Sequence, residues 1–212
     1  MVEKATALLN LYDRLILPWL IHRGMADERF RPLREELVAG TFGRVLEIGI
    51  GSGLNLPFYG RAVEEVVGVD PSAALLERAG RQSPWLGFRL RLLRQSAEHL
   101  PFDAATFDGA VVSWALCSIS DPLVALAEVR RVLKPGGRLH FIEHGLAADP
   151  GIARWQSRLT PLWRHCAGGC RLDRRPDALL AAAGFTLGDI ETGDLLEGPR
   201  LFTWHYRGRA VA

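Results

Sequence analysis

The spacing of apolar residues along this chain changes at Arg44. Before it, from Ala5 to about His22, apolar residues recur every three or four positions, which predicts a helix with one wide apolar face; 29–39 predicts a second helix. After it, short apolar runs bounded by glycine or polar residues predict strands at 44–48, 66–69, 88–93, 109–113, 139–142, 185–191 and 201–206. Further helices are expected at 73–81, 122–133, 151–166 and 176–183, with a helix or tight turn at 54–61.

This alternation of strands and helices predicts an α/β fold with a mainly parallel sheet covered by helices on both faces. The helix at 122–133 has the clearest boundaries, because Asp121 can cap it, Pro122 suits its first position and 135–137 should end it. The last two strands have no helix between them, so we expect them to pair antiparallel.

The composition is that of an ordinary globular domain. The chain has 212 residues, 48% hydrophobic and 24% charged, which argues against a disordered or fibrous protein. No low-complexity linker divides it, so we expect a single domain in which 1–40 forms an N-terminal helical lid on 41–212. The formal net charge is only +2 and the basic residues are dispersed, so we expect no nucleic-acid partner.

Three cysteines, Cys117, Cys166 and Cys170, are too few for a full disulfide framework. His165 adds a ligand atom, but the spacings match no established zinc motif and we predict no metal site. No signal-peptide pattern is visible, and the most apolar stretch, 15–21, is far shorter than the ~20 residues of a membrane span. We therefore expect a cytoplasmic protein without an integral membrane segment, while the amphipathic N-terminal helix leaves peripheral membrane contact open.

The segment VLEIGIGSG follows the first expected strand and predicts a sharp turn against which a ligand can approach the backbone. A dinucleotide fingerprint counted from Gly49 needs a third glycine where this chain has Leu54. The pattern is instead Glu47 followed by Gly49, Gly51 and Gly53. An acid there would repel a pyrophosphate but attract an ammonium group, directly or through water, which favours S-adenosylmethionine over NAD.

Two later segments fit an adenosine. Asp70 ends the second strand, before Pro71, where a carboxylate can accept hydrogen bonds from both ribose hydroxyls; a turn-forming aspartate is the alternative. After the third strand, Ser96 or the backbone of Ala97 should meet the adenine edge, with helix capping as the alternative for Ser96.

In this order, VLEIGIGSG, VVGVDPS, QSAEHLPF, FDGAVVS and EVRRVLKPGGRLHFIEH resemble the motifs of class I S-adenosylmethionine-dependent methyltransferases over 44–144. The resemblance implies a Rossmann-like sheet of seven strands in the order 3-2-1-4-5-7-6, with strand seven antiparallel. Many relatives carry Asp where this chain has Ser96. The cofactor contacts that we expect are Tyr12, Glu47, Gly49, Gly51, Asn55, Asp70, Pro71, Ser96, Ala97 and Ser113.

A narrower likeness rests on LNLPFY, LCS, the Glu143-His144 pair and the cysteines at 166–170. These are similar to methyltransferases that S-methylate small thiols, and less so to bacterial phospholipid and quinone methyltransferases. The resemblance implies methyl transfer to a small, fairly apolar acceptor, possibly a thiol. An NAD-dependent oxidoreductase and a catalytically silent cofactor-binding adaptor are the other hypotheses.

Candidate catalytic residues follow from the carboxyl ends of strands four and five, where open α/β sheets bind ligands. These positions are Ser113, Trp114, Glu143 and His144. His144 can take a proton near neutral pH and is the expected general base, although a locally hydrogen-bonded histidine fits the sequence as well. We expect Tyr12 to face the cofactor from the N-terminal lid.

Overall fold

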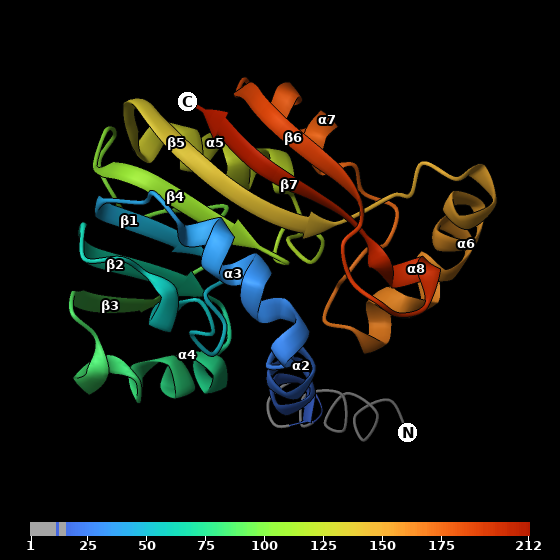
Figure 1. Cartoon of the computed structure of the whole chain (residues 1–212), viewed down its shortest axis with the longest axis horizontal. Coiled ribbons are helices and arrows are strands. Elements are labelled where there is room, and N and C mark those ends of the chain that lie inside the picture. Colours follow the sequence, from blue (N-terminus) through green and yellow to red (C-terminus); the bar gives the residue numbers. More distant parts are fainter. Residues whose placement is uncertain (1–11, 13–15) are drawn as a thin grey trace.

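The computed structural model describes Tyr12 and residues 16–212, which form a seven-stranded sheet in the order β3-β2-β1-β4-β5-β7-β6 (Figure 1). The strands are β1 (Gly43–Ile48), β2 (Val63–Asp70), β3 (Arg89–Arg94), β4 (Phe107–Ser113), β5 (Leu133–His144), β6 (Thr186–Asp194) and β7 (Trp204–Val211). Strands β1 to β5 pair in parallel, whereas β7 runs antiparallel to both β5 and β6. The predicted fold class, strand order and antiparallel pair are confirmed.

Helices α3, α4, α5 and α7 cover the faces of this sheet. The described helices are α2 (Leu17–Met25), α3 (Arg31–Val38), α4 (Ala73–Gly80), α5 (Pro122–Val132), α6 (Pro150–Cys166), α7 (Pro176–Ala182) and α8 (Arg200–Thr203), with 3-10 turns η2 (Glu28–Phe30), η3 (Leu56–Phe58) and η4 (Ser83–Trp85). Figure 1 shows α3 crossing in front of the sheet, with α5 and α7 behind it. One apolar cluster joins α5 and α7 to the sheet, and a second joins α3 and α4 to the opposite face.

The ends of α5 show how local sequence sets the elements. Asp121 Oδ1 accepts hydrogen bonds from the amides of Leu123 and Val124, both at 3.1 Å, as predicted for a helix cap. The helix ends at Val132, before 135–137, which we expected to stop it. That segment instead belongs to β5, whose pairing with β4 shifts register there.

Three expected elements differ from the structure. Within 54–61 only the 3-10 turn η3 forms, so of the two predicted alternatives the tight turn is confirmed and the helix is wrong. The segment expected as a strand at 201–206 begins as the short helix α8, and β7 starts at Trp204. The first expected helix lies partly outside the described residues, and α2 is its described end. Among the described helices, each is too short or too polar to cross a bilayer.

Candidate functional site

A cavity of about 430 Å³ lies at the carboxyl ends of β1, β2 and β4. The chain leaves β1 toward β2 and leaves β4 toward β5, so the strand order reverses between β1 and β4 and opens a crevice there. Such a volume suits a nucleoside-sized ligand. The polar and glycine lining is Gly49, Gly51, Asp70, Ser72, Gln95, Ser96, Glu98, Ser118, Ser120 and Gly168.

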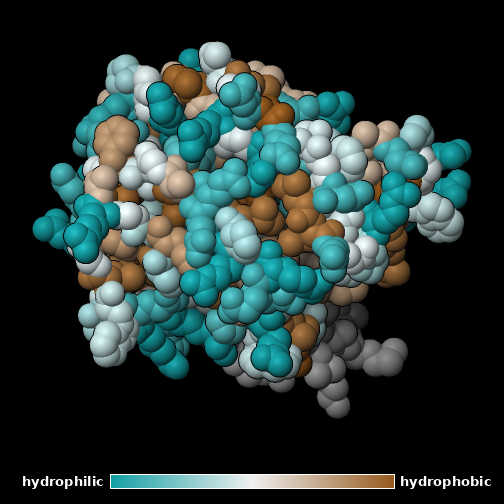
Figure 2. Space-filling model, in the orientation of Figure 1, coloured by the Kyte–Doolittle hydropathy of each residue, from teal (hydrophilic) through white to brown (hydrophobic). Residues whose placement is uncertain are grey.

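A larger hollow, of about 600 Å³, lies on another face, over β5, β7 and β6 beside α3. Figure 2 looks onto this side of the molecule and shows apolar residues bordered by hydrophilic ones. Its lining includes Leu37, Phe141, Arg207 and Arg209, and not the glycine turn or Asp70. Because parallel sheets bind ligands beyond their carboxyl ends, we assign the ligand site to the smaller cavity.

The glycine turn after β1 is shaped for a close ligand. Gly49, Gly51 and Gly53 have φ of +63°, +56° and +77°, which glycine adopts without steric cost. A Cβ at Gly49 would meet the Cβ of Ala115 at 2.5 Å, so this position needs glycine for packing. A Cβ at Gly51 would meet only the Gly49 carbonyl, at 3.8 Å, and the missing side chain there leaves room in the cavity.

Asp70 is one of the two acids in the cavity lining, with Glu98. Its Oδ2 accepts a hydrogen bond from the Gly51 amide at 3.0 Å, and its Oδ1 accepts one from the Ser72 amide at 2.8 Å. Burial raises its pKa. Each oxygen keeps a lone pair, so the carboxylate can also accept from two ligand hydroxyls. Pro71 follows in the lining, so the predicted pair lies together at the site.

Glu47, Asn55 and Ser113 lie behind the turn rather than along the cavity. Asn55 Nδ2 donates to Glu47 Oε1 at 2.8 Å and to Ser113 Oγ at 2.9 Å, while the Tyr59 hydroxyl donates to Glu47 Oε2 at 2.8 Å. Arg34 Nη1 donates to Asn55 Oδ1 at 2.8 Å. Burial raises the pKa of Glu47 to about 7. Glu47 is buried and does not line the cavity, so direct contact with an ammonium group has no support here, and contact through water stays a prediction.

The segment after β3 lines the cavity with Ser96, Ala97 and Glu98. Ser96 Oγ donates to Glu98 Oε2 at 2.6 Å, and Glu98 Oε1 accepts from the Asp121 amide at 2.7 Å. Glu98 therefore connects this segment to the start of α5. We expected 95–98 to meet the adenine edge through Ser96 or Ala97, and did not predict the hydrogen bonds of Glu98.

The N-terminal part reaches the site through α2. Leu17 and Ile21 line the cavity, and His22 Nδ1 lies 2.8 Å from Ser52 Oγ in the glycine turn. Tyr12 is placed differently from our expectation, because its hydroxyl donates to the Cys166 carbonyl at 2.7 Å and its side chain is not part of the cavity lining. Tyr12 thus connects the N-terminal segment to α6.

A second buried acid holds the backbone after β4. Glu143 Oε1 accepts from the amides of Ala115 and Leu116, at 2.7 and 3.0 Å, while its Oε2 is buried without a hydrogen-bond partner among the described residues. Burial raises its pKa to about 7. Trp114, which precedes Ala115, lines the cavity and has a φ of +50°. The Arg34 guanidinium lies 4.8 Å from the centroid of the Trp114 ring.

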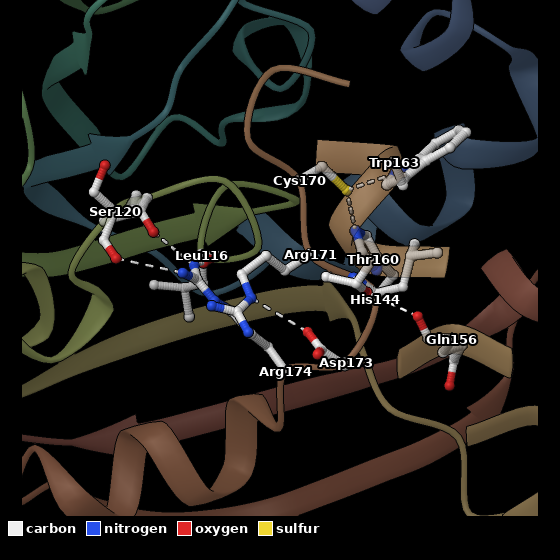
Figure 3. A network of polar contacts seen from close by, with 12 residues as sticks. Leu116, Ser120, His144, Gln156, Thr160, Trp163, Cys170, Arg171, Asp173 and Arg174 are labelled. Atoms are coloured by element: carbon white, nitrogen blue, oxygen red, sulfur yellow. Dashed lines mark hydrogen bonds and ion pairs between the residues drawn. The ribbon is translucent and has the colours of Figure 1, made fainter. Parts of the chain in front are cut away.

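His144 does not line the cavity; it lies beside two cysteines. Its Nε2 is 3.2 Å from Cys170 Sγ, and Trp163 Nε1 donates to the same sulfur at 3.3 Å. Figure 3 shows both rings directed at this sulfur. Cys117 completes the group, whereas Cys166 and His165, which we had considered together with Cys170, lie outside it.

The comparisons with known proteins agree with this geometry. A family model described as "Methyltransferase domain" matches residues 46–141. The chain is 31% identical to thiol S-methyltransferase TMT1B of Rattus norvegicus, covering 81% of this chain and 72% of the relative. It is 38% identical to the ubiquinone/menaquinone biosynthesis C-methyltransferase UbiE of Syntrophotalea carbinolica, covering 85% and 82%.

A third relative is the phosphatidylethanolamine N-methyltransferase of Cereibacter sphaeroides, 37% identical over 68% of this chain and 72% of the relative. Among solved structures, a protein from Bacillus halodurans described as a possible methyltransferase shares the fold, with a TM-score of 0.66, 17% identity and coverage of 85% and 95%.

Proposed function

This chain belongs to the class I S-adenosylmethionine-dependent methyltransferases, and we propose that it methylates a small, fairly apolar acceptor, with a thiol preferred. The observation that carries the proposal is the cavity lined both by Asp70 and the glycine turn and by the apolar side chains of Leu17, Ile21 and Trp114. Polar groups for the cofactor and apolar groups for the acceptor suit this reaction. The thiol preference rests on the likeness to the rat thiol S-methyltransferase.

The residues present fit the cofactor, since Gly51 leaves room in the cavity and Asp70 offers free lone pairs there. We propose that Gly49, Gly51, Asp70, Pro71, Ser96 and Ala97 contact it directly. Glu47, Asn55 and Ser113 act from behind by fixing the glycine turn, and the N-terminal segment that includes Tyr12 acts as a lid. When bound, S-adenosylmethionine supplies a methyl group on a positively charged sulfur.

The chain's own task is to align the acceptor, exclude water and accept a proton. A thiol has a pKa of about 8.5, so modest assistance converts it to the nucleophilic thiolate. We propose His144 as the group that takes this proton. With the cofactor bound, the acceptor sulfur would take the methyl carbon as its bond to the sulfonium breaks, and the electron pair of that bond would stay on the cofactor sulfur.

A labelled-methyl assay across small thiols, ethanolamine lipids and quinols tests the acceptor. We expect label on a thiol; transfer to the lipid amine or the quinol instead would favour the alternatives that the Cereibacter and Syntrophotalea relatives suggest. Calorimetry with S-adenosylhomocysteine and NADH tests the cofactor. Binding of NADH alone would overturn the proposal, and binding of S-adenosylhomocysteine without transfer to any acceptor would indicate a silent adaptor.

We also propose a cytoplasmic location and no nucleic-acid partner. All three cysteines are free thiols, which suits a reducing compartment, and the net charge is only +2.

A further inference from the structure

The structure brings together three metal-ligating side chains that the sequence keeps far apart. Cys117 follows β4, His144 ends β5, and Cys170 follows α6. One ligand atom from each lies within 4.8 Å of the other two. Spacing along the chain predicted no metal site, because these ligands come from three separate segments: the loop after β4, the end of β5 and the loop after α6.

We propose that Cys117, His144 and Cys170 bind a zinc ion whose fourth position takes the acceptor as a thiolate. This inference rests on the proposed function for the identity of the acceptor. Thiolate and imidazole are ligands that zinc prefers. With Zn–S bonds of about 2.3 Å and Zn–N bonds of about 2.0 Å, neighbouring ligand atoms of a tetrahedral site lie roughly 3.5–3.8 Å apart. In this structure the three ligand atoms lie within 4.8 Å of one another, and His144 Nε2 lies 3.2 Å from Cys170 Sγ. Small side-chain shifts would bring these distances to the zinc values.

The loops that carry the two cysteines are fixed to each other without a disulfide. The Arg171 amide donates to the Cys117 carbonyl at 2.9 Å. Arg174 Nη1 donates to the carbonyls of Leu116 and, at 2.7 Å, Ile119, and Figure 3 shows this guanidinium reaching the loop. Both loops therefore hold their thiols in place before an ion arrives, which lowers the ordering cost of binding.

The cluster adjoins the cofactor cavity. Ser118 and Gly168 line that cavity, and they stand one residue after Cys117 and two residues before Cys170. Three protein ligands are the number found in catalytic zinc sites, whose fourth position stays open for water or substrate. A position open to the acceptor would place its sulfur next to the methyl donor.

Zinc coordination deprotonates a thiol. In the zinc-loaded protein the acceptor loses its proton to water on binding, and His144 is a ligand instead of a base. The sulfur lone pair then forms the bond to the methyl carbon as described above. The products are the methyl thioether, S-adenosylhomocysteine and one proton.

Metal binding is tested first, on the full chain stripped with a chelator and kept reduced. We expect it to take up a single zinc ion, and the cobalt-substituted form to show thiolate-to-metal absorption with the intensity of two cysteine ligands. Cys117→Ser and Cys170→Ser should each weaken zinc binding on the order of 100-fold, whereas Cys166→Ser, which removes an exposed thiol outside the cluster, should not. No uptake by the unmodified chain, or equal affinity in all three variants, would overturn the site.

The absorption intensity of the cobalt-substituted, unmodified chain gives the number of thiolate ligands, even if a variant fails to fold. Adding a small thiol to the cobalt form should then change the absorption, because a third sulfur enters the coordination sphere. An unchanged spectrum would overturn the fourth-ligand role. Binding of S-adenosylhomocysteine, measured separately, reports on the proposed function alone, so failure of the methyltransferase proposal and failure of the zinc site are distinguishable.

Discussion

Asp70, Glu47 and Glu143 are buried carboxyl groups near the same edge of the sheet, and their partners separate their roles. Asp70 faces the cavity and keeps free lone pairs. Glu47 is surrounded by protein donors, and Glu143 holds the backbone after β4 through one oxygen. Substitution of Asp70 should therefore change ligand binding, whereas substitution of Glu47 should change stability.

Asp70→Asn tests the first of these roles. The amide group removes the charge and one acceptor, so S-adenosylhomocysteine should bind roughly 10- to 100-fold more weakly, the equivalent of losing a hydrogen bond to a charged group. Calorimetric titration measures this. The exposed Asp103→Asn is the matched control and should bind as the unmodified chain does. Equal affinities for Asp70→Asn and the control would remove Asp70 from the site.

Glu47→Gln tests the second role through pH. Folding raises the pKa of Glu47 from 4.5 to about 7, so the stability that this group contributes is complete below pH 4.5 and is lost as pH rises through 7. Glutamine does not titrate. As pH rises over this range, the free energy of unfolding should therefore fall on the order of 3 kcal/mol less in the variant than in the unmodified chain.

Urea unfolding between pH 4.5 and 8 gives this difference. Glu143 titrates in the same direction and is present in both proteins, so it cancels in the comparison. The exposed Glu64→Gln should keep the pH dependence of the unmodified chain. Parallel stability curves for Glu47→Gln and the unmodified chain would contradict the prediction.

At the scale of elements, α2 is the part of the N-terminal segment that closes the cavity. It contributes Leu17 and Ile21 to the lining, and its contact with the glycine turn is the His22–Ser52 pair. Trp19 and Leu20 on the same helix are about half exposed, so packing secures α2 weakly.

His22→Ala should therefore loosen the lid more than it destabilises the fold. Losing one hydrogen bond, worth about 0.5–1.5 kcal/mol, should speed release of S-adenosylhomocysteine up to roughly tenfold. Stopped-flow displacement measures the release rate. His165→Ala, an exposed histidine on α6, is the control. If both variants release the ligand at the unmodified rate, α2 does not act as a lid.

The sequence predicted elements whose signals are local. Asp121 and Pro122 mark the start of α5, and the glycine spacing after β1 identifies the cofactor turn. It did not predict contacts between distant loops. The positions of Arg34 against Asn55, and of His144 against Cys170, depend on how α3 and the segment after α6 pack on the sheet. For the same reason the sequence placed Glu47 at the ligand, directly or through water, and did not predict its hydrogen bonds to Tyr59 and Asn55 behind the cavity.

At the scale of the whole molecule, ligand binding and folding are linked. The cavity lining comes from α2, β1, β2, α4 and the segments after β1, β3, β4 and α6, so unfolding destroys the site. A ligand that binds only the folded state must stabilise it.

S-adenosylhomocysteine at 100 times its dissociation constant should thus add about 3 kcal/mol of stability. For a chain of this length the midpoint of thermal unfolding should rise by roughly 5–10 °C. Scanning calorimetry measures the shift, with NADH at equal concentration as the control. A shift with NADH and none with S-adenosylhomocysteine would contradict the assigned cofactor.

The cavity lining and the cluster of Cys117, His144 and Cys170 draw on different parts of the chain. The described cavity lining precedes residue 121, except for Gly168, whereas His144 and Cys170 come from the later part. Exchanging 145–175 between relatives should therefore alter which molecule is methylated while the cofactor contacts proposed for Gly49, Gly51 and Asp70 stay in place. New acceptors would then require changes in 145–175 alone, while the part of the chain before residue 121 keeps holding the methyl donor.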